Sequence, residues 1–100
     1  MQDHLVDIHR KIALHQNLPD PFRTTTRIPF SMRVSGVVTV TVYDLHGHEI
    51  KTLLREWRAA GDHGVDFDGQ GFPEGLYLYR LTVDDIVKTK TMLLLRENVV

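Results

Sequence analysis

Apolar and polar residues alternate with a period of two along most of the chain beyond residue 24. Ile28, Phe30 and Met32 alternate with other residues, and 38–43 (VTVTVY) is β-branched at nearly every position. Such alternation is typical of strands that bury one face. The pattern predicts six strands, at residues 27–32, 38–43, 49–54, 65–68, 76–83 and 86–96.

Turn-forming residues separate these runs. Glycine in 44–48 (DLHGH) favours a hairpin with Gly47 at a positive φ angle, and 35–36, 69–75 and 84–85 also carry turn signals. Residues 55–61 are expected to form a loop that holds Trp57, the only tryptophan. Short strands with turns every 8–12 residues, and no βαβ spacing, predict an all-β fold. The expected architecture is an Ig-like or fibronectin-like antiparallel β-sandwich of six to seven strands.

The first 18 residues follow a different pattern. Leu5, Ile8 and Ile12 fall at helical spacing and Asp3 suits the cap of a helix, so this segment is interpreted as either a short helix or a linker. Pro19 and Pro21 would end any helix. The expected organisation is an N-terminal segment, 1–18, followed by the sandwich at 19–98.

Composition narrows the possible functions. The 100 residues carry 12 Lys plus Arg, 13 Asp plus Glu and no cysteine. Balanced charge argues against a general nucleic-acid binder, and the lack of cysteine excludes disulfides and thiol catalysis. No apolar run is long enough to cross a bilayer. The start lacks the basic region of a signal peptide, which predicts either a cytoplasmic chain or a piece cut from a longer protein.

Candidate chemistry is sparse. His46 and His48 are two residues apart and could bind a metal such as zinc or nickel. The carboxylates of Asp62, Asp66 and Asp68 could bind calcium. Neither set has a complete ligand pattern, and ordinary surface turns explain both sets better. His4, His9 and His15 do not share a helix face. Neither serine, Ser31 or Ser35, lies in a nucleophile motif. We therefore expect no enzyme, no cofactor and no metal site. A small carbohydrate- or metal-binding module is a weaker alternative.

Two segments are candidates for contacts with a partner. Trp57, flanked by Arg55 and Arg58, suits either a surface contact or a cap over the end of the sandwich. In the last strand Lys88, Lys90, Met92, Leu94 and Arg96 share one face, and neither face is wholly polar. This mixture predicts a bulge near Met92, and it suits either an edge strand protected by its lysines or a recognition surface.

Five motifs resemble, in order and in spacing, the type A C-terminal sorting domain of the type IX secretion system, which is similar to the Ig-like domain of the flagellar hook-capping protein. They are 16–22 (QNLPDPF) with the threonines after it, 42–47 (VYDLHG), 60–63 (AGDH), 75–81 (GLYLYRL) and 90–96 (KTMLLLR). The resemblance covers residues 14–98. It assigns structural roles to Pro19, Pro21, Phe22, Tyr43, Asp44, Gly47, Gly61, Gly75, Tyr77, Tyr79 and Leu81.

The resemblance implies a non-catalytic module that directs an attached protein through type IX secretion to the cell surface or medium. Its partners would be the outer-membrane secretion machinery and a parent protein fused N-terminally, with neither nucleic acid nor membrane insertion involved. Lys88, Lys90, Met92, Leu93, Leu94, Leu95 and Arg96 are the expected partner-binding residues. The alternative is a structural spacer or assembly domain that uses exposed strand edges, as in hook capping.

Overall fold

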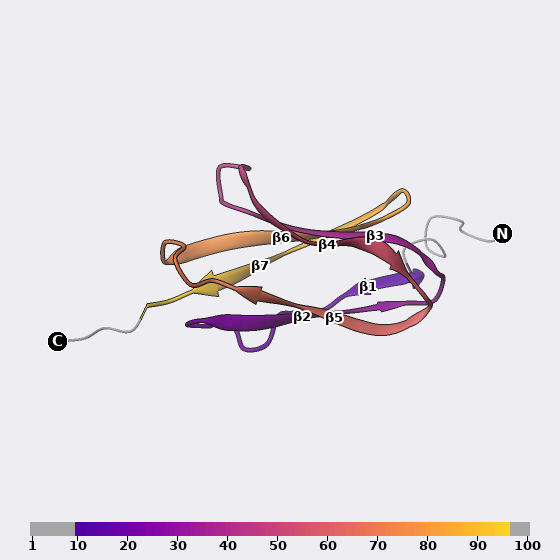
Figure 1. The fold of residues 1–100 in the computed structure, drawn as a ribbon, viewed down its shortest axis with the longest axis horizontal. Coiled ribbons are helices and arrows are strands. Elements are labelled where there is room, and N and C mark those ends of the chain that lie inside the picture. The colour runs from indigo at the N-terminus through magenta and orange to yellow at the C-terminus, as the bar shows by residue number, and fades with distance from the viewer. Residues whose placement is uncertain (1–9, 97–100) are drawn as a thin grey trace.

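Seven strands form two sheets that pack face to face in the computed structural model, which describes residues 10–96 (Figure 1). They are β1 (Ile12–Leu14), β2 (Thr25–Met32), β3 (Gly36–Tyr43), β4 (Glu49–Arg58), β5 (Gly61–Asp68), β6 (Gly75–Val83) and β7 (Ile86–Leu94). One sheet has the order β1-β2-β5 and the other β4-β3-β6-β7. All the strand pairs are antiparallel, which confirms the predicted β-sandwich.

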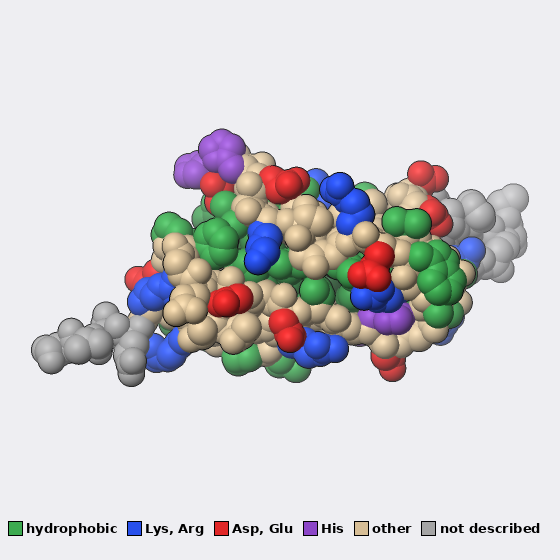
Figure 2. Space-filling model, viewed as in Figure 1, with side chains coloured by type: hydrophobic (Ala, Val, Ile, Leu, Met, Phe, Trp, Pro, Cys, Tyr) green, Lys and Arg blue, Asp and Glu red, His purple; other side chains and the backbone are tan. Residues whose placement is uncertain are grey.

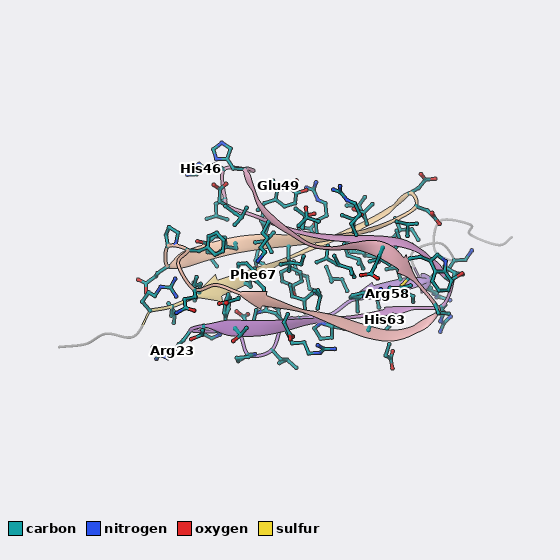
Figure 3. All side chains as sticks on the ribbon, viewed as in Figure 1. Arg23, His46, Glu49, Arg58, His63 and Phe67 are labelled. Carbon is teal, nitrogen blue, oxygen red and sulfur yellow. The ribbon has the colours of Figure 1, made fainter. Side chains whose placement is uncertain are left out.

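The core lies between the sheets and follows from the alternation. Tyr77, Tyr79, Leu81 and Val83 alternate along β6, point inward and are buried. The Phe67 ring lies between the two layers (Figure 3), 5.9 Å from the Phe22 ring centre in an edge-to-face arrangement. Offset and edge-to-face aromatic pairs of this kind add to the stabilisation from burial.

The turn predictions are largely confirmed. Gly47 has φ 87° in the β3–β4 hairpin, and the β6–β7 hairpin turns at 84–85 with Asp84 at φ 51°. No bulge occurs near Met92, because the β6–β7 register runs unbroken from Gly75–Leu94 to Val83–Ile86. The irregularities lie instead between β3 and β4. Arg10 and β1 line the groove beside Lys88 and Lys90, and both lysines stay half-exposed without a change of register.

One predicted element is wrong, and another is tested only at its end. Ile12 belongs to β1, which pairs with β2, and not to a helix. The rest of the expected helix, with Asp3, Leu5 and Ile8, lies outside the described residues, as do His4 and His9. The expected 55–61 loop is mostly strand, because β4 continues to Arg58 and β5 begins at Gly61. A charged edge strand needs little apolar alternation, so its sequence looks like a loop.

No helix in the described part of the chain is long and apolar enough to cross a membrane.

Candidate partner-binding surface

The strand β7 is an edge of its sheet, and it lies beside β1, an edge of the other sheet. The predicted partner-binding residues of this strand do not form one continuous surface, because some of them are buried. Met92 and Leu94 are buried in the core, whereas Lys88, Lys90, Leu93, Leu95 and Arg96 are half-buried. Of the predicted set, the lysines at the start of the strand have charged ends that can reach a partner.

The segment 16–22 covers the second half of the β7 edge. The Phe22 N–H donates to the Leu93 carbonyl at 3.0 Å, and the Leu95 N–H donates to the Phe22 carbonyl at 2.9 Å. The Leu93 N–H donates to Asp20 Oδ1, and Gln16 Nε2 donates to the Thr91 carbonyl. These bonds occupy backbone groups that an edge strand otherwise leaves open to another chain.

A buried polar network holds this segment in place, and sequence reasoning missed it. Asn17 is fully buried; its Nδ2 donates to Thr26 Oγ1 and to the Pro19 carbonyl. Its backbone N–H donates to the Tyr79 hydroxyl, which in turn donates to the His15 carbonyl. Burial raises the pKa of Tyr79 to about 12. The signal for this network was the asparagine within the QNLPDPF motif.

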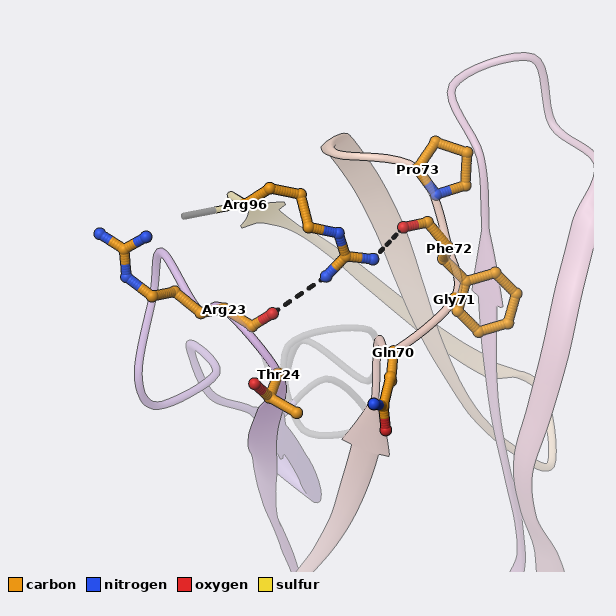
Figure 4. Close-up of a pocket in the computed structure, with 7 residues that line it drawn as sticks. All are labelled: Arg23, Thr24, Gln70, Gly71, Phe72, Pro73 and Arg96. Atoms are coloured by element: carbon orange, nitrogen blue, oxygen red, sulfur yellow. Dashed lines mark hydrogen bonds between the residues drawn. The ribbon is translucent and has the colours of Figure 1, made fainter. Parts of the chain in front are cut away.

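Arg96 closes the end of β7 (Figure 4). Its guanidinium donates to the carbonyls of Arg23, Gly69 and Phe72, and its backbone N–H donates to Glu74 Oε1. The surrounding pocket is lined by the loops that carry these carbonyls, and the Arg23 side chain is directed away from Phe72 and Pro73 across it. Arg96 therefore ties the end of β7 to two loops, the one before β2 and the one between β5 and β6, and its donors face the protein's own carbonyls.

The motif residues make the following contacts in the fold. Tyr77 donates to the Pro73 carbonyl four residues upstream at 2.5 Å, and burial raises its pKa. Asp44 accepts backbone hydrogen bonds from His48 and His46, and these bonds lower its pKa. Phe22 and Leu81 are buried. Gly61 and Gly75 have φ angles of 141° and 147°, in a region that favours glycine.

The candidate metal sites are not assembled in the described residues. His46 and His48 lie at the tip of the β3–β4 hairpin, which projects from the sheets (Figures 2 and 3), and no third ligand joins them. Asp62 accepts from Ser31 Oγ, Asp66 pairs with Arg27, and Asp68 accepts from the Gln70 N–H. The last of these is the local turn that the sequence predicted.

Trp57 does not cap the sandwich. It lies in β4 directly opposite Val37 of β3, on the outer face, and 60% of its surface is exposed. Arg58 pairs with Glu56 at 2.6 Å, and this hydrogen bond lowers the pKa of Glu56. Of the two predicted roles for Trp57, the exposed position leaves the surface contact.

A family model described as a secretion system C-terminal sorting domain matches residues 18–94. No curated protein and no solved structure matches the chain. The likeness to the Ig-like domain of the flagellar hook-capping protein therefore stays a prediction.

Proposed function

Because the chain belongs to the family of secretion system C-terminal sorting domains, which serve type IX secretion, we propose that the machinery recognises its folded sandwich by direct protein–protein contact. The attached protein would precede it in the chain and reach the cell surface or medium. The sorting module would itself catalyse no reaction.

The observation that carries this proposal is the position of β7. It is an edge strand, and half of its edge is covered by 16–22 while the other half carries Lys88 and Lys90. A sorting signal must be present on the surface after folding, and the lysines meet that requirement. Met92 and Leu94, being buried, would act by holding the strand in the sheet.

An export assay tests the proposal. The full chain would be fused behind a reporter with a standard signal peptide, in a bacterium with a working type IX system and in a translocon mutant. We expect the reporter outside the cell only in the first host, and we expect K88E/K90E to reduce export strongly. Lys51→Glu with Arg55→Glu, on the opposite edge strand β4, is the matched control for charge reversal.

Point substitutions are preferable to removing residues 88–100. That deletion would also remove Met92 and Leu94 from the core, so it would confound lost recognition with unfolding. Periplasmic retention of a folded fusion, while a known family member is exported, would contradict the proposal. A stable oligomer of the purified chain would then favour the spacer or assembly role.

A further inference from the structure

Among residues 10–96, no segment forms hydrogen bonds with the outward backbone edge of the first half of β7. Leu93 and Thr91 turn backbone groups away from β6, since these groups bond the 16–22 segment. Along an antiparallel strand the direction of the backbone groups alternates. The N–H and C=O groups of Val87 and Thr89 therefore also face away from β6, beyond the reach of that segment.

A groove of about 390 Å³ runs beside this open edge, between β7 and β1. Arg10, Lys88 and Lys90 line it, together with Ile12, Leu14 and Thr89. No carboxylate among residues 10–96 forms a salt bridge with any of the three cations. Within the described part of the chain, the groove thus combines a row of strand groups that have no hydrogen-bond partner with a concentration of positive charge.

The lysines have a spacing that matches a strand. Lys88 and Lys90 stand directly opposite Leu81 and Tyr79 of β6, so their side chains share the inner face of the sheet. A strand added to the edge of β7 would place every second side chain on this same face. Carboxylates at alternate positions would then meet the two ammonium groups, with Arg10 nearby.

The same charges act against self-pairing. Two β7 edges brought together would place Lys88 and Lys90 of one copy beside those of the other, and like charges at directly opposed positions are destabilising. Inward-pointing charges of this kind are a known means of preventing edge-to-edge aggregation. They also select for a strand of opposite charge.

We propose that the open half of β7 binds an extended acidic segment of a partner protein, which adds to the sheet as a further strand. This inference rests on the proposed function, because it names the chemistry of the partner that reads the last strand. The partner is identified by alternating carboxylates and by a backbone free to form strand hydrogen bonds.

The test uses the purified full chain and a fluorescent seven-residue peptide of alternating threonine and glutamate. Two controls are a peptide with lysine in place of glutamate and a composition-matched peptide with its glutamates in one block. We expect saturable binding of the alternating acidic peptide only, with anisotropy as the readout. In NMR spectra, the backbone amide chemical shifts that change most on binding of this peptide should be those of Val87 and Thr89.

Two protein variants separate the charge from the backbone edge. K88E/K90E should weaken binding of the acidic peptide at least about tenfold and create binding of the lysine peptide. Thr89→Pro removes an outward N–H while leaving the β6 ladder intact, and it should also weaken binding about tenfold. Lys51→Glu, on β4, should leave binding unchanged. An acidic peptide N-methylated at alternate residues should fail to bind the unaltered protein.

Several results would overturn the inference. They are no saturable binding, equal binding of the block and N-methylated peptides, or a dimer of the chain that excludes the peptide. If Thr89→Pro lost peptide binding but was still exported, the sorting function would stand. Only the role of an added strand in export would then be rejected. A folded variant that still binds the peptide but is no longer exported would show that the translocon reads another part of the sandwich. That result would leave the peptide site standing.

Discussion

Replacing Tyr79 with phenylalanine should be among the most damaging single-atom changes in this protein. The hydroxyl bonds two backbone groups at once, accepting from Asn17 N–H at 3.0 Å and donating to the His15 carbonyl at 2.8 Å. His15 stands next to Pro29, which has no N–H to offer that carbonyl, while the His15 N–H donates to the Pro29 carbonyl. Tyr79 thus supplies a donor that the strand pair lacks.

The cost follows from leaving both groups unpaired. A buried backbone group without a partner costs about 1–3 kcal/mol, and the His15 carbonyl is only partly buried, so we expect a loss of about 2–4 kcal/mol. That is a large fraction of the roughly 5–15 kcal/mol typical of small domains. The midpoint of thermal unfolding should fall by at least about 8 °C.

Urea unfolding at neutral pH, followed by circular dichroism, measures this loss. Tyr43→Phe is the control, because Tyr43 lies on the outer face, its ring under the Arg80 guanidinium, and its hydroxyl has no hydrogen bond within residues 10–96. It should change the free energy of unfolding by less than about 0.5 kcal/mol. The reasoning would be refuted if Tyr79→Phe stayed within that same range.

Four further predictions concern stability. Since folding raises the pKa of Tyr79 from 10.0 to about 12, this group should not affect the pH dependence of the free energy of unfolding below pH 10, and should lower that free energy between pH 10 and 12. Urea titrations over this range should show a shallower fall for Tyr79→Phe than for the unaltered protein. Equal slopes would contradict the assignment. Arg96→Met should cost about 1.5–3 kcal/mol, because three carbonyls lose a charged donor, whereas Arg23→Met, whose side chain points outward, should be nearly neutral by the same urea assay. Gly69→Ala should lower the midpoint of thermal unfolding, because the new Cβ would lie 3.0 Å from Phe22 and 3.1 Å from Leu94. An unchanged midpoint would mean that these two side chains move aside freely. Gln70→Ala, at the next position, is the control. Folding lowers the pKa of Asp44, so its stabilising effect should be present above pH 3.8 and be lost as pH falls through the lower folded value; Asp44→Ala should flatten the acid limb of the free energy of unfolding in urea titrations, and an unchanged limb would contradict this assignment.

The sequence predicts the long strands because their burial follows a strict alternation, as in β6. It fails where an element is too short or too charged to alternate, as in β1 and the end of β4. The covering of the β7 edge could not be predicted, because Phe22 and Leu94 meet through a parallel bridge between segments distant in sequence. No local pattern encodes that contact.

The motif residues and the proposed contact residues have different roles in the fold. Asn17, Pro19 and Phe22 are explained by folding alone, since they satisfy buried groups, accept hydrogen bonds or fill the core. A resemblance carried by such residues identifies the sandwich and says little about which atoms touch the machinery. Lys88 and Lys90 show the reverse: they are half-buried at the rim, and among residues 10–96 their ammonium groups form no salt bridge. Positive charge without a salt bridge, beside a strand edge that no described segment pairs with, is the feature of this fold that best fits binding to a partner.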